Sequence, residues 1–154
     1  MSLWLFIHVL GVVFLLGNAF TVTFWKVRSD YSEDLSLKLQ TAKNIMVLDY
    51  IFTLPSIVMI LASGHVLAHN AGYSVFSWSW LGISYGLFIL SGVIWIVALL
   101  PLQMAMIKHG KQSCEQQTLT PEFERVSHRW NIYGVLATVT PIAAMILMVW
   151  KPEL

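Results

Sequence analysis

The stretch that decides the fold is residues 3–25, LWLFIHVLGVVFLLGNAFTVTFW, which contains no Asp, Glu, Lys or Arg. A helix of about 20 mostly apolar residues can cross the hydrocarbon core of a bilayer. Three further stretches meet this condition and contain Asp49 as their only charged residue: residues 45–68, 80–107 and 130–150. The sequence therefore predicts an all-α integral membrane protein, a four-helix up-and-down bundle that forms a single domain over residues 1–154.

The composition agrees with a membrane protein and excludes several classes of function. Hydrophobic residues make up 57% of the chain and charged residues 11%, against about 25% charged in soluble domains, and the mean hydropathy is +0.70. The net charge of +1 gives no basis for nucleic-acid binding. The single cysteine, Cys114, excludes an intrachain disulfide and a Cys-rich metal cluster. The expected partners are the lipid bilayer and either a homo-oligomer or a larger membrane complex.

The basic residues predict the orientation. Of the 9 Lys and Arg residues, all except Lys151 lie between spans one and two or between spans three and four. Cytoplasmic loops are enriched in Lys and Arg. We therefore expect these two connections in the cytoplasm, and both termini on the non-cytoplasmic side of the cell inner (plasma) membrane. All tryptophans except Trp95 fall at predicted span ends, where indole rings prefer the headgroup boundary.

Two motifs predict where helices begin outside the membrane. Asp30 followed by Glu33 resembles an N-cap with its N3 partner, so the second span is expected to start early, as an amphipathic helix. Thr120 followed by Pro121 is typical of an N-cap and an N1 proline, which predicts an early start for the fourth helix as well.

Each of the last three spans also contains a proline. A proline cannot donate to the carbonyl four residues earlier, so we expect kinks and free carbonyls. The prolines are Pro55, Pro101 and Pro141, and the carbonyls are those near Ile51, Val97 and Ala137. Such kinks either open room for a ligand or serve packing, and the sequence leaves both alternatives open.

The first span carries one stripe of unusual residues at helical spacing. Polar groups in lipid are costly and usually face the interior of a bundle, so this stripe is expected to face inward. Its role is either close helix packing with a hydrogen-bonded Asn18 or, for His8, ligation of a cofactor. The stripe consists of His8, Gly11, Leu15, Asn18, Val22 and Trp25.

The second span carries a polar stripe that includes the one intramembrane carboxyl group. The stripe consists of Asp49, Thr53, Ser56 and Ser63. Because an unpaired carboxylate at membrane depth is costly, we expect Asp49 to pair with a cation or a hydrogen-bond donor near the cytoplasmic boundary. Lys26 and Arg129 are the candidate cations. The alternative is that Asp49 relays protons.

Histidines near the outer ends of the first two spans suggest a cofactor or metal site. His65 and His69 are four residues apart, the spacing at which two imidazoles can meet one metal ion. On a straight helix, however, His65 lies about 160° from Asp49, so both can face the interior only if Pro55 bends the helix. The residues allow b-type haem held by His8 and His65 with Asn18 nearby, or a metal held by His8, His65 and His69.

The chain resembles an uncharacterised bacterial family of small predicted integral membrane proteins over nearly its whole length. The residues that carry the resemblance are His8, Gly11, Gly17, Asn18, Trp25, Lys26, Asp49, Pro55, Ser63, Gly64, Ser91, Gly92, Trp95, Pro101, Gln103, Arg129, Trp130, Gly134, Pro141, Trp150, Lys151 and Pro152. More distantly, the first span resembles the membrane protoporphyrinogen oxidase HemJ and the copper-resistance D membrane domain. Those families imply a b-type haem or a copper site. The resemblance supports His8 as a ligand, but it identifies no second haem ligand in this chain.

Three functional hypotheses follow. The chain is a redox or haem-related membrane protein that binds b-type haem, a copper- or metal-handling membrane protein, or a non-enzymatic membrane subunit or assembly factor. We see no phosphate-binding loop, dinucleotide fingerprint or zinc-protease motif. No catalytic residue can therefore be assigned from the sequence.

Overall fold

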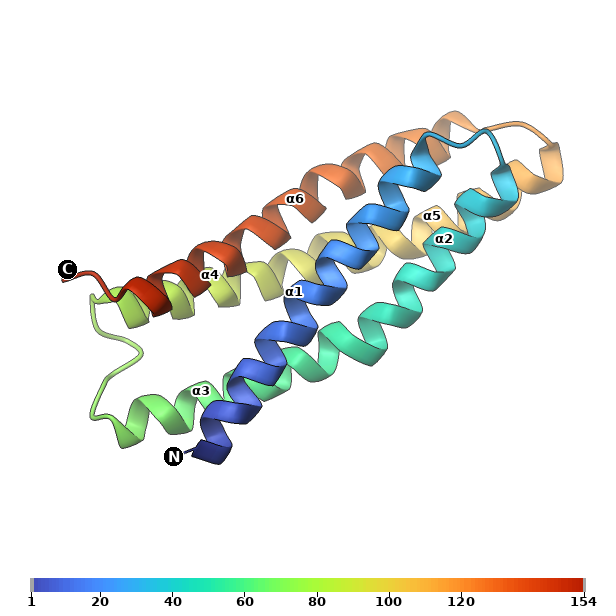
Figure 1. The fold of residues 1–154 in the computed structure, drawn as a ribbon. Coiled ribbons are helices and arrows are strands. Elements are labelled where there is room, and N and C mark those ends of the chain that lie inside the picture. The colour runs from blue at the N-terminus through green and yellow to red at the C-terminus, as the bar shows by residue number, and fades with distance from the viewer. Residues whose placement is uncertain (1, 154) are drawn as a thin grey trace.

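The computed structural model describes residues 2–153, which form four long antiparallel helices packed as a bundle (Figure 1). The first and last are single helices, α1 (Ser2–Asp30) and α6 (Pro121–Trp150). The second consists of α2 (Leu35–Leu48), η1 (Asp49–Thr53) and α3 (Leu54–Asn70), and the third of α4 (Trp80–Ile94), η2 (Trp95–Leu99) and α5 (Leu100–Gln116). All four are long and apolar enough to cross a membrane, which confirms the predicted all-α bundle of four apolar helices.

Both termini lie at one end of the bundle, together with the connection between α3 and α4 (Figure 1). The two connections that carry the basic residues lie at the opposite end, which we call the charged end. There the helices extend beyond the predicted spans, to Asp30 in α1 and to Gln116 in α5.

Local signals explain where these helices begin and end. The cap of α2 is Asp34, whose side chain accepts hydrogen bonds from the backbone N–H groups of Ser36 and Leu37. The predicted cap at Asp30 is therefore wrong, because Asp30 is the last residue of α1 and its carboxylate is bound by Lys26 one turn earlier. The predicted cap of α6 is confirmed, since the Thr120 side chain accepts a hydrogen bond from the N–H of Phe123.

The prolines are accommodated in two ways. Pro55 and Pro101 are each preceded by a π-helical turn, η1 and η2, in which the backbone hydrogen bonds span one residue more than in an α-helix. Pro141 lies inside α6, where the carbonyl it leaves free, that of Ala137, accepts a hydrogen bond of 2.7 Å from Ser91 Oγ of α4. The predicted free carbonyl near Ala137 therefore joins two helices.

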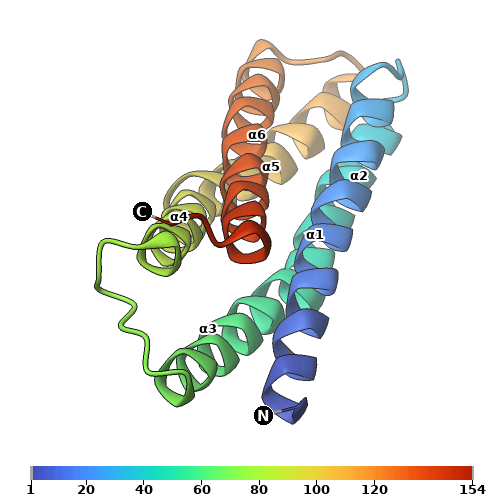
Figure 2. The ribbon, with the colours of Figure 1, turned by 60° about the vertical axis from the view of Figure 1, so that its left-hand side comes forward.

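The bundle is closed at the charged end and splayed at the other. Figure 2 shows α1 alongside α3, and α4 alongside α6, with the two pairs diverging toward the termini. At Gly11 the first pair approaches closely, because a Cβ atom there would lie 2.9 Å from Ile60 Cγ1. The main apolar core lies toward the charged end and contains Val22, Ala42, Ile45, Trp95, Leu99, Met106, Phe123 and Trp130.

Candidate functional site

A buried carboxylate is the centre of the bundle's polar contacts. Asp49 Oδ1 accepts hydrogen bonds from Asn18 Nδ2 of α1 at 3.1 Å and from Thr53 Oγ1 at 2.9 Å. Asp49 Oδ2 accepts from Trp95 Nε1 of η2 at 3.2 Å and from Gln103 Nε2 of α5 at 2.6 Å. Asp49 and Thr53 belong to η1, so both π-helical turns contribute to this centre. We call these five residues the Asp49 centre.

The Asp49 centre contains no cation. Asp49 is only 7% exposed, and within residues 2–153 the one ion pair is that between Lys26 and Asp30. We expected Lys26 or Arg129 as a cationic partner, and this is wrong, because Lys26 binds Asp30 and Arg129 is exposed. The other half of the prediction, a hydrogen-bond donor, is confirmed. Neutral donors can serve because each of the two carboxylate oxygens can accept two hydrogen bonds.

A cavity of about 80 Å³ adjoins the Asp49 centre. It lies between the two helix pairs, and most of its wall is apolar. Exposed Thr23 also lines it, so the cavity reaches the surface of the bundle. The wall is formed by Leu15, Leu16, Ala19, Val22 and Thr23 of α1, by Asp49, Thr53 and Ile57, by Phe88, Ser91, Gly92, Trp95 and Leu99, and by Trp130, Gly134, Ala137, Thr138 and Pro141 of α6.

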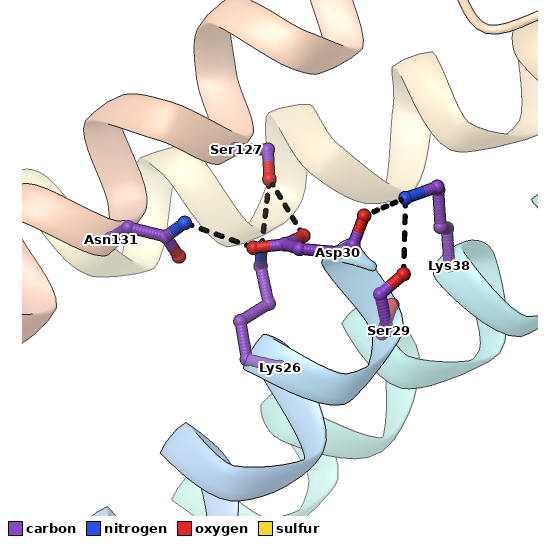
Figure 3. A network of polar contacts seen from close by, with 6 residues as sticks. All are labelled: Lys26, Ser29, Asp30, Lys38, Ser127 and Asn131. Atoms are coloured by element: carbon purple, nitrogen blue, oxygen red, sulfur yellow. Dashed lines mark hydrogen bonds and ion pairs between the residues drawn. The ribbon is translucent and has the colours of Figure 1, made fainter. Parts of the chain in front are cut away.

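A second polar network ties α1 to α6 at the charged end (Figure 3). Lys26 Nζ donates to both carboxylate oxygens of Asp30, at 2.5 and 2.6 Å, and to Ser127 Oγ at 2.7 Å. Asn131 Nδ2 donates to the same carboxylate at 2.9 Å. Lys26 is only 3% exposed, so its charge is satisfied by these partners within the bundle.

Lys38 of α2 extends this network to a third element. Its Nζ donates to the backbone carbonyl oxygens of Ser29 at 3.0 Å and Asp30 at 2.9 Å (Figure 3). The last carbonyl groups of a helix lack partners within the helix and carry partial negative charge, so a lysine there stabilises the end of α1. Trp130 lies between the two polar centres, since it lines the cavity and its ring centroid is 5.8 Å from Lys26 Nζ.

The stripe predicted on the first span faces inward over most of its length. Gly11, Asn18 and Val22 are buried, and His8 is half-buried against α3. At the charged end the prediction is wrong, because Trp25 is exposed and Lys26 is buried instead. The ion pair with Asp30 allows Lys26 to turn inward. The polar stripe of the second span is also buried at Asp49, Thr53, Ser56 and Ser63.

The structure places the predicted histidine ligands in different surroundings. His8 Nδ1 lies 3.1 Å from Ser63 Oγ, and a Cβ atom at Gly64 would lie 3.1 Å from His8 Cε1. His65 and His69 are both exposed. Among residues 2–153, no group of three or more His, Cys, Asp or Glu side chains is arranged to hold a metal ion. Asn18, expected beside a cofactor, instead donates to Asp49 and Thr53.

One feature of His8 does fit a haem ligand. The hydroxyl hydrogen of Ser63 is directed to the carbonyl oxygen of Met59, so Ser63 Oγ accepts the hydrogen bond from His8 Nδ1–H. If His8 is neutral and donates through Nδ1 to Ser63, its Nε2 carries no hydrogen, which is the form that ligates iron. The fit is partial, because His65 is exposed and no second axial ligand is placed with His8 among the residues that the structure describes.

Several residues of the two polar centres were missed by sequence reasoning. Gln103 was noted only for the family resemblance, and Trp95 for that and as the one tryptophan away from the span ends, yet both bind Asp49. Gln103 is the only amide in the third predicted span, and an uncommon polar residue in a span could have identified it. The pair formed by Lys26 and Asp30 is spaced i, i+4, a spacing that favours ion pairs on helices.

Comparison with known proteins agrees with these observations. No curated protein and no solved structure matches the chain, so the likeness of the first span to HemJ and to the copper-resistance D domain stays a prediction. Over residues 2–152 the chain matches the family described as "Predicted integral membrane protein (DUF2269)". That range includes all four apolar helices. The chain therefore belongs to the DUF2269 family of predicted integral membrane proteins.

Proposed function

We propose that this chain is a non-enzymatic membrane protein that binds the cationic head group of a small amphiphilic molecule in the cavity beside Asp49. The observation that carries the proposal is a buried carboxylate with no cation beside it among residues 2–153, in the wall of an apolar cavity that reaches the surface of the bundle. An apolar pocket with a few convergent polar groups is the usual form of a small-molecule site.

The size of the cavity limits what can bind. Its volume of about 80 Å³ is well below the roughly 300–1,000 Å³ of pockets that enclose a drug-sized ligand. We therefore expect only the head group to enter, while an apolar chain extends past Thr23 into the bilayer.

Charge selects the head group. Both oxygens of Asp49 already accept two hydrogen bonds each. An ammonium group need not displace these donors, because attraction between charges acts over several ångströms in a low-dielectric interior. An anionic head group would be repelled by the same carboxylate.

Thermal stability in lipid nanodiscs tests the proposal. The probes are n-octylammonium, neutral n-octanol and n-octyl sulfate, which differ in head group but not in chain length. A ligand that binds only the folded state raises the Tm, so octylammonium is expected to raise it more than the other two. Equal shifts for all three compounds would contradict the proposal.

Two glycines of α4 provide a matched pair of variants. A Cβ atom at Gly92 or at Gly86 would meet no other atom within 4 Å, but Gly92 lines the cavity and Gly86 does not. Gly92→Leu is expected to fill the cavity and abolish the octylammonium shift, whereas Gly86→Leu should retain it. If octylammonium raises the Tm of a folded Gly92→Leu protein as much as that of the wild type, the ligand binds outside this cavity.

The second candidate function is haem binding, favoured by the contact of His8 Nδ1 with Ser63 Oγ, which can hold the imidazole with Nε2 available to iron. His8 would hold the iron on one side, and b-type haem would supply one-electron redox chemistry. The test compares the absorption spectra of wild type and His8→Ala, purified in parallel with haem supplied. Loss of a Soret band in folded His8→Ala supports ligation by His8, and equal spectra contradict it.

We also propose the bacterial inner (plasma) membrane as the location, with both termini on the non-cytoplasmic side. The support is the position of the basic residues, all of which except Lys151 lie at the charged end. The positive-inside rule places that end in the cytoplasm.

A further inference from the structure

We infer that the connection between α3 and α4, residues 71–79, lies in the head-group layer of the bilayer and that Phe76 and Trp78 contact phospholipids there. The partner is the lipid leaflet at the end of the bundle where both termini lie. The inference holds for either orientation of the bundle in the membrane. It does not depend on a ligand in the cavity beside Asp49.

The connection folds back along α4 and does not simply extend away from the bundle. The ring of Phe76 packs against the ring of Tyr85, with the two centroids 6.3 Å apart. Helix α4 begins at Trp80, so Tyr85 lies about 7.5 Å further along the helix, at a rise of about 1.5 Å per residue. Phe76 is therefore level with the first turns of an apolar helix that is long enough to cross the membrane.

Gly82 and Val75 hold the connection against the bundle. A Cβ atom at Gly82 would collide with the backbone carbonyl oxygen of Ser77, and it would lie 3.3 Å from that of Val75. The connection can therefore pass directly over α4 only because this position is a glycine. The side chain of Val75 is buried, in a small apolar cluster with Ala68 of α3 and Leu81 of α4. These contacts make the connection a packed element of the bundle.

Two aromatic side chains of this packed connection are left uncovered by the protein. Phe76 is 87% exposed and Trp78 is 86% exposed, and residues 71–79 contain no Asp, Glu, Lys or Arg. Uncovered apolar groups that lie together mark surfaces that bind a partner or a membrane. Aromatic rings, and tryptophan above all, are enriched where the hydrocarbon core meets the head groups.

Serine side chains satisfy backbone groups within the connection. Ser74 Oγ accepts a hydrogen bond of 3.3 Å from the N–H of Phe76, and Ser77 Oγ donates one of 2.7 Å to the carbonyl oxygen of Ser74. A backbone group without a partner is costly wherever water is scarce. Internal pairing thus reduces the cost of moving this segment from water into the head-group layer.

Lipid is the occupant that the position of these aromatics favours. The chain is an integral membrane protein, and α4 presents exposed apolar side chains such as Ile89 and Val93 along its length. Phe76 contacts the same helix at Tyr85, so the connection continues the surface that α4 presents to the bilayer. Binding of a second copy of the chain, or of another protein, is the competing explanation.

Photocrosslinking in nanodiscs of phosphatidylethanolamine and phosphatidylglycerol tests the inference. The photoreactive residue p-benzoylphenylalanine replaces Phe76, Trp78 or Tyr31 in three separate full-length proteins. Tyr31 is the matched control, because it is 88% exposed but lies in the connection between α1 and α2, near the charged residues Asp30 and Glu33. All three side chains are largely uncovered, so circular dichroism should show the same helix content as in the wild type.

Mass spectrometry after irradiation gives the result. We expect covalent lipid adducts in the Phe76 and Trp78 proteins at a yield several-fold higher than in the Tyr31 protein. Yields no higher than that of the Tyr31 protein would mean that the connection lies in water, and the inference would be wrong. Crosslinks to a second copy of the chain in place of lipid would also overturn it. Neither result affects the octylammonium test, so failure of this inference is distinct from failure of the proposed function.

Discussion

Replacing Asp49 by alanine is expected to destabilise the bundle, because the change removes a hydrogen-bond acceptor shared by three long helices. In Asp49→Ala, Asn18 retains Thr53 as an acceptor, since Asn18 Nδ2 already lies 2.9 Å from Thr53 Oγ1. Thr53 Oγ1 also loses Asp49 as an acceptor, but a hydroxyl group in a helix can donate to the backbone carbonyl four residues earlier instead. Trp95 Nε1 and Gln103 Nε2 lose the only acceptor that each has among the described residues. The hydrogen bonds that are lost without replacement are therefore those between the second and third long helices.

The magnitude follows from these two donors. A buried donor left without a partner costs about 1–3 kcal/mol, so two of them predict a loss of about 2–6 kcal/mol in the free energy of unfolding. Side-chain hydrogen bonds in membrane proteins average about 0.6 kcal/mol and reach about 1.7 kcal/mol, which favours the lower half of that range. Asp49→Asn should cost less, because the introduced amide can donate to Oε1 of a rotated Gln103 and its oxygen can still accept from Asn18 and Thr53, although Trp95 Nε1 and Gln103 Nε2 are left without acceptors.

The assay is reversible unfolding in mixed micelles with increasing sodium dodecyl sulfate, followed by circular dichroism and tryptophan fluorescence. The matched control is Glu115→Ala, which removes an exposed carboxylate from the charged end of α5 and should change stability by less than about 0.5 kcal/mol. The control variant is expected to be the most stable of the three, Asp49→Asn less stable, and Asp49→Ala the least stable. If Asp49→Ala is as stable as the control, the hydrogen bonds of the Asp49 centre do not hold the bundle together.

Three further predictions concern topology, helix approach and the charged end. Reporter fusions after Ser113 should score as cytoplasmic and fusions after Gly72 as external; a cytoplasmic score at Gly72 would overturn the orientation. Gly11→Leu should lower the free energy of unfolding by about 1–3 kcal/mol through overpacking against α3. The control is Gly17→Leu, which should leave the free energy of unfolding unchanged in the same assay, because a Cβ atom there meets nothing within 4 Å. Lys26→Met should destabilise by about 1–3 kcal/mol by removing a hydrogen-bond partner of Asp30, and a stability equal to wild type would show that this ion pair contributes nothing.

The sequence by itself determined the four helices, for a reason that is almost independent of tertiary contacts. In a bilayer every backbone polar group must be bonded internally, so an apolar stretch of sufficient length has to be helical. Local chemistry also identified the cap at Thr120 and the free carbonyl at Ala137, because both depend on residues within about one helical turn. The inward stripe at Gly11 and Asn18 could likewise be found from spacing alone.

Only the tertiary structure decided which side chains meet across helices. The partners of Asp49 lie 31 residues away at Asn18, 46 at Trp95 and 54 at Gln103. Their meeting depends on how far each helix is rotated about its axis, and the π-helical turns before Pro55 and Pro101 change that rotation within the span. Spacing along a helix specifies a face but not what packs against it. The sequence could therefore show that Asp49 needs a partner, while the packing of the helices determined that the partners are neutral.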